Sequence, residues 1–330
     1  MIEGAPRIAL VIEGGTVFSG SIRDATVKVI IAGGTGFIGK ALVMRLVDRH
    51  HIIVLSRDPM RAKASMGNIC ECVGWDAEHA GDWEQALNDC DAIVNLAGAS
   101  IADARWTSAR KRVLLSSRLH ATKALVSASA RLARKPSVLI NASGVGLYGA
   151  SDDRRLDEHA DSGKGFLSEL CTAWEAEANV GQARGVRVVC LRIGLVLERT
   201  GGALPRMALP FQLFVGGPVM PGTQWVSWIH RVDLVGLIEW AMSNEKVSGP
   251  VNAVAPNPTT MSEFCRALGE VLKRPSWLPV PEFILKLALG ELGSVMTTGQ
   301  RVVPVRAQSG GYRFHHPFLK EALRAIFERV

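Results

Sequence analysis

A glycine-rich stretch from Gly33 to Gly39 carries the clearest chemical signal in the chain. Its first glycine permits a sharp turn, Gly36 lets a pyrophosphate approach the backbone, and Gly39 lets a following helix pack closely. A β-branched run at 27–31 precedes the stretch, and apolar residues at helical spacing follow it at 42–47. A helix N-terminus offers free N–H groups and a positive dipole end, so the pattern predicts a strand, a phosphate-binding turn and a helix. An ordinary βα turn is the alternative.

Three residues are candidates for moving protons. Ser143 follows a predicted strand at 137–142, and a serine at the carboxyl end of a central strand points into the ligand crevice of an open α/β sheet. Tyr148 carries the phenol nearest to Ser143 in the sequence, and His230 would titrate near neutral pH if it were exposed. We expect Ser143 to work with Tyr148 or His230, while a structural role for His230 is the alternative.

The second predicted strand, 52–55, ends at Ser56 and Arg57. An acidic side chain there would bind the ribose 2′-hydroxyl of NAD, whereas an arginine fork suits a 2′-phosphate. The sequence therefore favours NADP(H) over NAD(H). Asp58 keeps NAD(H) open, but it precedes Pro59 and is expected to cap the next helix.

Two later segments extend the predicted site. Asp76 follows the third strand, where it would accept a hydrogen bond from the adenine amino group or simply stabilise a turn. The fourth strand, 91–98, ends in Ala97 and Gly98, whose small size lets the backbone lie beside phosphate and ribose. Arg118, in a long helical stretch at 105–132, would reach the cofactor or lie on the surface.

Strands and helices alternate over residues 27–197, which predicts an α/β fold with a Rossmann-type, doubly wound parallel sheet. The expected organisation is an N-terminal extension (1–26), an NADP-binding domain (27–199) with sheet elements returning up to about 255, and a substrate-side and tail region (200–330). Within the extension, 8–12 could form a strand and 14–20 a loop. Loops rich in Gly, Pro and Trp at 200–230 predict a partly aromatic substrate pocket.

Composition excludes several classes of protein. The net charge of +7 is scattered, with its densest cluster at 105–112, so a nucleic-acid site is not expected. No C-x-x-C pair or metal-ligand spacing occurs among the six cysteines, which predicts buried free thiols and no metal. The chain lacks a long apolar run and a signal peptide, so we expect a cytoplasmic protein without a membrane span. The helical stretch at 105–132 could pair two chains in a homodimer.

Several segments together resemble the extended short-chain dehydrogenase/reductase superfamily, of the NAD-dependent epimerase/dehydratase type. They are Gly33–Gly39, Asn95–Gly98, Ser117–Arg118, Phe166–Glu175, Gly216–Pro218, Trp228–Asp233 and Asn252–Pro256. The set is similar to an atypical "epimerase family protein" subgroup, whose bacterial members are sometimes labelled cell-division-inhibitor homologues. The C-terminal stretch, including Gln300–Pro304, resembles that subgroup's tail domain of unknown function. The resemblance covers about residues 27–328.

This resemblance implies NADP(H) binding and an unknown small-molecule substrate. The residues that it places along the cofactor are Thr35, Phe37 and Ile38 on the turn, Ser56 and Arg57 at the 2′-phosphate, and Leu96, Ala97, Arg118 and Val196. Active members of the superfamily carry a Tyr and a Lys four residues apart on one helix, where the Tyr moves a proton and the Lys lowers its pKa. Leu167 and Cys171 stand at those positions here.

Three functions are consistent with the absence of the Tyr and Lys pair. The first is an oxidoreductase or epimerase that transfers hydride at a carbonyl or alcohol carbon, with Ser143, Tyr148 or His230 as a rearranged acid and base. The second is a regulatory or sensor protein that binds NADP(H) without turning it over and shows an exposed apolar patch for a partner. A nucleic-acid binder ranks last, because its motifs are missing.

Overall fold

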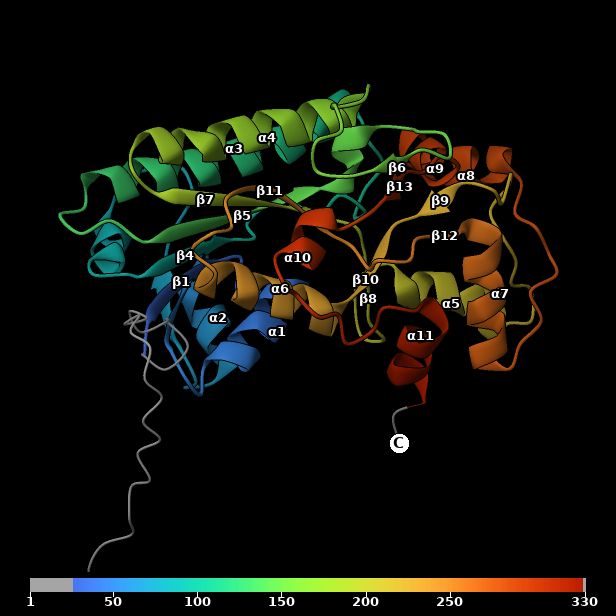
Figure 1. Ribbon diagram of the computed structural model, residues 1–330, viewed down its shortest axis with the longest axis horizontal. Coiled ribbons are helices and arrows are strands. Elements are labelled where there is room, and N and C mark those ends of the chain that lie inside the picture. Colours follow the sequence, from blue (N-terminus) through green and yellow to red (C-terminus); the bar gives the residue numbers. More distant parts are fainter. Residues whose placement is uncertain (1–25, 329–330) are drawn as a thin grey trace, which may run out of the picture.

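The structure is a computed structural model that describes residues 26–328 (Figure 1). The strand expected at 8–12 and the loop at 14–20 lie outside the described residues. The strands are β1 (Lys28–Ala32), β2 (His51–Ser56), β3 (Glu71–Gly74), β4 (Ala92–Asn95), β5 (Val138–Gly144), β6 (Arg155–Leu156), β7 (Arg187–Ile193), β8 (Leu195–Leu197), β9 (Trp225–Val226), β10 (Trp228–His230), β11 (Gly249–Ala253), β12 (Thr259–Thr260) and β13 (Arg301–Val302). The helices are α1 (Phe37–Leu46), α2 (Pro59–Met66), η1 (Asp82–Leu87), α3 (Ser108–Arg131), η2 (Val145–Tyr148), α4 (Phe166–Ala183), α5 (Leu204–Gln212), α6 (Arg231–Ser243), α7 (Met261–Leu272), α8 (Glu282–Leu289), α9 (Glu291–Met296), α10 (Val305–Ser309) and α11 (Leu319–Phe327).

One parallel sheet organises the molecule. Its strand order is β3-β2-β1-β4-β5-β7-β11, and every neighbouring pair runs in the same direction. The order reverses between β1 and β4, and in such sheets the ligand crevice lies outside the carboxyl ends of the strands at this point. The predicted doubly wound α/β fold is therefore confirmed, and β11 adds a strand from beyond residue 200.

Alternation along the strands gives the sheet two buried faces. Val29 and Ile31 of β1 belong to the apolar cluster that includes residues of α1 and α6, while Ile30 belongs to the cluster formed with α3 and α4. Figure 1 shows these helix pairs on opposite sides of the sheet. Helix α3 begins three residues later than expected, because the side chain of Thr107 caps it by accepting the N–H of Arg110.

A separate apolar cluster lies under α5, α7 and α11, and Trp228 is fully buried in it together with Phe264. Trp228 therefore belongs to a core and does not line a substrate pocket, contrary to the expectation for residues 200–230. The expectation of loops there is also wrong for α5. Pro205 is tolerated in the first turn of that helix, and Pro210 lies inside it.

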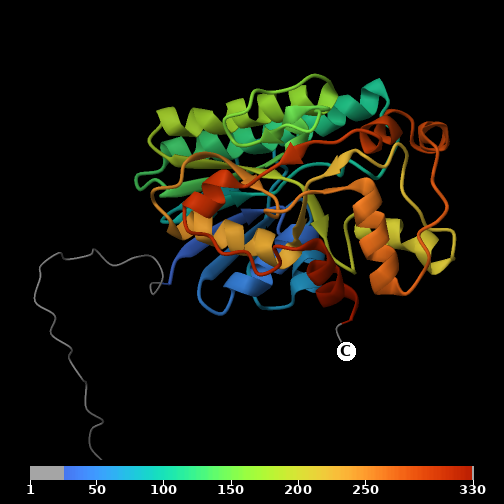
Figure 2. The ribbon, with the colours of Figure 1, turned by 45° about the vertical axis from the view of Figure 1, so that its right-hand side comes forward.

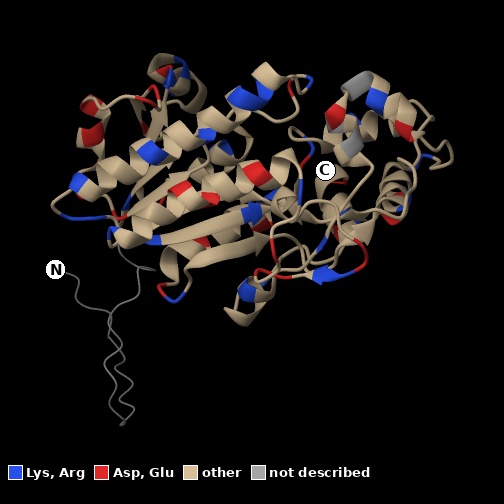
Figure 3. Ribbon diagram, turned by 90° about the horizontal axis from the view of Figure 1, so that it is seen from above, with Lys and Arg blue, Asp and Glu red and all other residues tan. Residues whose placement is uncertain are grey.

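The C-terminal segment returns to the sheet. Strand β13 pairs in parallel with β6, and the buried carboxylate of Asp233 in α6 accepts the N–H groups of His315 and His316 at 2.7 and 2.9 Å. Figure 2 shows this segment, coloured red, passing beside α6. Acidic and basic residues are interspersed over the α3–α4 face (Figure 3). No helix within residues 26–328 has the length and apolarity to cross a membrane.

Candidate functional site

The turn between β1 and α1 is built around two glycines that accept no side chain. Gly33 has a φ of +78°, and a Cβ on it would lie 2.8 Å from the carbonyl of Leu96. A Cβ on Gly39 would lie 2.3 Å from the Gly33 oxygen. Gly36 differs, because it is exposed and a Cβ there would meet only the Gly33 oxygen, at 3.2 Å. The space in front of Gly36 is therefore open to a ligand.

Helix α1 starts at this turn without a charge or side chain that satisfies its N-terminus. Gly36 is the N-cap and makes no side-chain hydrogen bond, and the first turn holds no acidic residue. The first N–H groups and the positive dipole end therefore face the open space, which suits a phosphate. Beside them, Thr35 is exposed and Ile38 is half-buried. The ring of Phe37 fills the space that Cβ atoms on Gly201 and Gly202 would need.

At the end of β2, Arg57 lines a pocket of about 530 Å³ together with Trp75, Asp76 and His79. Within residues 26–328, no hydrogen bond or ion pair engages the Arg57 side chain. Ser56 points its hydroxyl at the carbonyl of Asp58, and Asp58 caps α2, as expected. A free guanidinium in a pocket at this strand end suits a phosphate monoester.

Asp76 is a turn residue. One carboxylate oxygen accepts the N–H groups of Glu78 and His79 at 2.8 and 2.9 Å, and the other lies 2.7 Å from the ring of His79. The N–H groups of His79 and Glu78 hold the pKa of Asp76 well below its usual range, and Asp76 raises the pKa of His79. Both oxygens thus have local partners, and a role of Asp76 in binding adenine stays a prediction.

The end of β4 forms the next part of the crevice. The N–H of Ala97 points at the side chain of Asn95, which in turn donates to Asn141 of β5 at 2.7 Å. Leu96 follows β4, and its backbone crosses directly over Gly33. Gly98 is needed for space, because a Cβ on it would lie 3.1 Å from the side chain of Arg118.

Arg118 is buried, so the alternative of a surface arginine is wrong. Its side chain is 6% exposed and donates one hydrogen bond, to the carbonyl of Leu114 at 2.9 Å. The guanidinium lies 5.0 Å from the ring of Trp174, and its Nε has no hydrogen-bond partner. No salt bridge to it occurs among residues 26–328. Burial lowers the pKa of Arg118.

Ser143 lies in a buried ionic network. Its hydroxyl donates to Glu175 of α4 at 2.7 Å, and Arg192 of β7 binds both oxygens of the same carboxylate at 2.9 Å. Ser143 and Arg192 are register partners in the sheet, and α4 covers them. Sequence analysis missed Glu175 and Arg192, because only the pairing of β5 with β7 brings the three side chains together.

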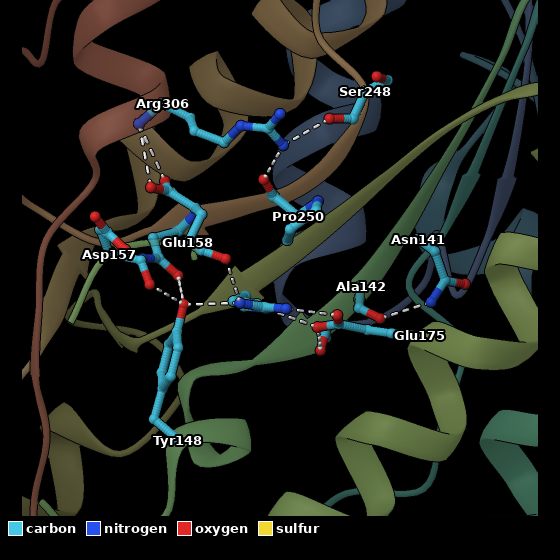
Figure 4. Close-up of polar contacts among 12 residues, drawn as sticks. Asn141, Ala142, Tyr148, Asp157, Glu158, Glu175, Ser248, Pro250 and Arg306 are labelled. Carbon is cyan, nitrogen blue, oxygen red and sulfur yellow. Dashed lines mark hydrogen bonds and ion pairs between the residues drawn. The ribbon is translucent and has the colours of Figure 1, made fainter. Parts of the chain in front are cut away.

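Tyr148 occupies the other end of this network. Its hydroxyl lies 2.7 Å from the side chain of Asn252, 3.0 Å from the carbonyl of Asp157 and 2.9 Å from Arg192. Arg192 donates to the hydroxyl of Tyr148 and to the carboxylate of Glu175, two side chains that Figure 4 labels. Burial raises the pKa of Tyr148. A catalytic role for Tyr148 stays a prediction, which these partners do not favour.

The positions of the missing Tyr and Lys are filled by apolar packing. Leu167 packs against Gly146, where a Cβ would lie 2.9 Å from it. Cys171 is buried beside Ser143 and Gly144, and burial, with Glu175, raises the pKa of its thiol to about 11. Neither side chain therefore carries a charge at neutral pH, nor can Leu167 move a proton.

His230 has a structural position. It is 2% exposed, its Nδ1 accepts the N–H of Val232 and thereby caps α6, and its ring lies 4.0 Å from that of His316. Val196 pairs with Ile229 in the short β8–β10 ladder beside it. A catalytic role for His230 also stays a prediction, which its capping role in α6 does not favour. Within residues 26–328, no cluster of His, Cys, Asp and Glu could hold a metal, and all six cysteines are free.

Comparison with known proteins agrees with this architecture. Residues 29–254 match the NAD dependent epimerase/dehydratase family, and residues 280–326 match a domain of unknown function, DUF1731. The chain is 42% identical over 315 residues to the chloroplastic epimerase family protein SDR39U1 homolog of Arabidopsis thaliana, covering 94% of this chain and 90% of that protein. It is 40% identical over 301 residues to the epimerase family protein YfhF of Bacillus subtilis, covering 91% and 97%.

A solved structure is also similar to this chain. The crystal structure of human epimerase family protein SDR39U1 (isoform 2) with NADPH has a TM-score of 0.83 and 35% sequence identity, and the match covers 92% of this chain and 100% of that one. The sheet order, the glycine turn and these matches lead to one assignment: the chain belongs to the NAD dependent epimerase/dehydratase family.

Proposed function

We propose that this protein binds NADPH across the carboxyl edge of the sheet, with the 2′-phosphate in the pocket at Arg57. The free Arg57 guanidinium in that pocket is the observation that carries the proposal. The open face of Gly36 and the uncapped N-terminus of α1 support a pyrophosphate at the turn. The similar human protein is crystallised with NADPH.

The proposed reaction is hydride transfer at a carbonyl or alcohol carbon of a small substrate. When bound, NADPH would supply the hydride for reduction, and NADP+ would accept it for oxidation. Ser143 is the proton carrier at the crevice: in the oxidation direction its oxygen takes the proton of the substrate hydroxyl while its own proton passes to Glu175, 2.7 Å away. Arg192 holds the Glu175 carboxylate in place through two hydrogen bonds.

A second candidate is a sensor that binds NADPH and reports it to a partner protein. One observation favours it. Large apolar side chains are exposed at the end of α5, in the 277–278 segment and on α8. This apolar patch consists of Leu213, Phe214, Trp277, Leu278, Phe283, Ile284 and Leu287. The 277–278 segment lies against this end of α5, because the indole of Trp277 donates to the carbonyl of Phe214. Exposed apolar groups of this kind serve as protein contacts in other proteins.

Titration of the purified protein with NADPH and NADH tests cofactor binding. Arg57→Asp should weaken NADPH roughly tenfold to hundredfold, because a charge-assisted bond contributes about 1.5–3 kcal/mol, and should leave NADH binding nearly unchanged. Arg61→Asp, an exposed change in α2, is the matched control and should have no effect. If neither nucleotide binds, the proposal is wrong.

Turnover separates the two candidates. The NADPH-loaded protein is mixed with each of a panel of ketones and aldehydes, and the oxidation of NADPH is followed by the absorbance at 340 nm. For the enzyme, Ser143→Ala should lower kcat about 10²-fold or more with the Kd for NADPH unchanged. Tight NADPH binding without turnover of any carbonyl in the panel would favour the sensor.

A further inference from the structure

A second pocket lies outside the nucleotide crevice, between helices α5, α7 and α11. Its volume is about 410 Å³, which suits a small molecule. Helix α7 packs against both α5 and α11, and Figure 1 shows the three helices together at the end of the molecule away from β1. None of the residues that line this pocket lines the pocket at Arg57. It is therefore a separate site, which the proposed function does not use.

Most of the pocket wall is apolar, and three helices contribute to it. Gln212 is exposed and lies on the same face of α5 as two of the apolar residues, which are three and four positions apart from one another and from it. The ends of α7 and α11 belong to the apolar cluster around Trp228, so the core holds this part of the wall in place. The apolar side chains of the wall are Pro205, Ala208, Val271, Leu272 and Phe327.

Arg199 brings one positive charge to this pocket. Within residues 26–328, no hydrogen bond or ion pair engages its guanidinium. The carboxylate of the preceding Glu198 is bound by Arg231 at 2.7 Å, and that of Glu270 in α7 is bound by Lys320 at 2.6 Å. Neither carboxylate therefore neutralises Arg199. A guanidinium in this state can bind a ligand carboxylate through two parallel hydrogen bonds.

One positive charge beside an apolar wall defines the class of ligand. A nucleotide or a sugar phosphate would bring several charges and hydroxyl groups, which apolar side chains cannot bind. A single carboxylate matches the single arginine, and burial of an apolar chain or ring against the wall is favourable. We infer that this pocket binds a small amphipathic monocarboxylate, with its carboxylate at Arg199 and its apolar part against α5, α7 and α11.

Octanoate is the probe, and isothermal titration calorimetry of the full chain measures its Kd. Two related compounds separate the parts of the ligand: 1-octanol keeps the apolar chain without the charge, and acetate keeps the charge without the chain. We expect octanoate to bind at least tenfold more tightly than either, because only octanoate contacts both Arg199 and the apolar wall.

Three variants locate the site. Arg199→Gln should raise the Kd of octanoate about tenfold or more and leave that of 1-octanol unchanged, because it removes only the charge-assisted contact. Gln212→Trp places a large side chain at an exposed position of the wall and should weaken octanoate and 1-octanol together, severalfold. Arg266→Gln, the matched control, removes an exposed arginine of α7 that lies outside the pocket and should change neither Kd.

A fourth variant distinguishes the two pockets. Arg57→Asp should leave octanoate binding unchanged, and Arg199→Gln should leave NADPH binding unchanged. The inference is overturned if octanoate does not bind, if Arg199→Gln binds octanoate as the unmodified protein does, or if it loses octanoate and 1-octanol equally. None of these outcomes affects the proposed function. Conversely, failure to bind NADPH by a protein that binds octanoate as expected overturns the proposed function alone.

Discussion

At the scale of single residues, we expect the buried pair of Glu175 and Arg192 to have a large effect on stability. Glu175→Gln removes the carboxylate and leaves the Arg192 guanidinium buried without a counter-charge. We expect the free energy of unfolding to fall by about 3–5 kcal/mol. Urea unfolding measures this change. Asp152→Asn, which breaks an exposed pair with Arg154, should leave the midpoint where it is, and equal effects of the two variants would contradict the expectation.

Glu158 predicts a pH dependence. Burial raises its pKa, against the opposing N–H groups of Asn252 and Arg306. The folded state therefore holds this proton more tightly than the unfolded state, whose carboxyl titrates near the ordinary value of 4.5. Stability contributed by Glu158 is present below that value and is lost as the pH rises toward the raised pKa.

The measurement is the difference in unfolding free energy between the unmodified protein and Glu158→Gln, followed from about pH 4 to pH 8. The difference should shift steadily against the unmodified protein as the pH rises, since the variant lacks the titrating group. A difference that stays constant over this range would show that the Glu158 pKa is not raised.

Residues of the site differ in how far sequence reveals them. Arg57 directly follows β2, and Gly36 lies in the turn after β1, so local order places both at the crevice. Glu175 and Arg192 are 17 residues apart in different elements, and nothing in their local pattern indicates a pair. The sequence assigns Arg118 to a helix but does not show that its side chain is buried in the protein, because arginine side chains are mostly exposed.

At the scale of elements, the turn between β1 and α1 holds one glycine that we expect to matter for stability and another that we expect to matter for ligand binding. Gly39→Ala forces a Cβ to within 2.3 Å of the Gly33 oxygen, so the turn must open, and we expect a loss of stability of about 1–3 kcal/mol. Gly36 has a φ of −76°, which any residue adopts, and its Cβ site is exposed. Gly36→Ala should therefore keep the melting temperature within a few degrees but weaken NADPH tenfold or more, because the methyl group occupies the ligand's space.

Thermal unfolding and NADPH titration of both variants check this contrast. Equal losses of stability would show that Gly36 serves the fold and not a ligand. The elements themselves were largely predictable, because apolar alternation identifies buried strands whatever their partners. Helix α5 was not, since Pro205 and Pro210 are typical of loops in a sequence, and only its packing on the cluster around Trp228 makes it a helix.

At the scale of the whole molecule, the C-terminal segment is part of the core of the nucleotide-binding sheet. Ala307, Tyr312 and Phe314 join the apolar cluster of β1 and α1, and Tyr312 donates to the backbone of Asp233 at 2.9 Å. Such interleaving could not be predicted from the sequence, because the contacts join segments about 80 residues apart. It implies that the C-terminal segment and the nucleotide-binding sheet unfold together.

Asp233→Ala tests this coupling. The change leaves the N–H groups of His315 and His316 without an acceptor in a buried place, and we expect a loss of about 2–5 kcal/mol and faster proteolysis within 307–316. In the unmodified protein, far-ultraviolet circular dichroism and tryptophan fluorescence should give coincident urea transitions. Trp75 and Trp83 report on the part of the chain before residue 200, and Trp225 and Trp228 report on the part after it. Two separate transitions there would show that the tail is an independent unit, and Asp233→Ala would then alter only the weaker one.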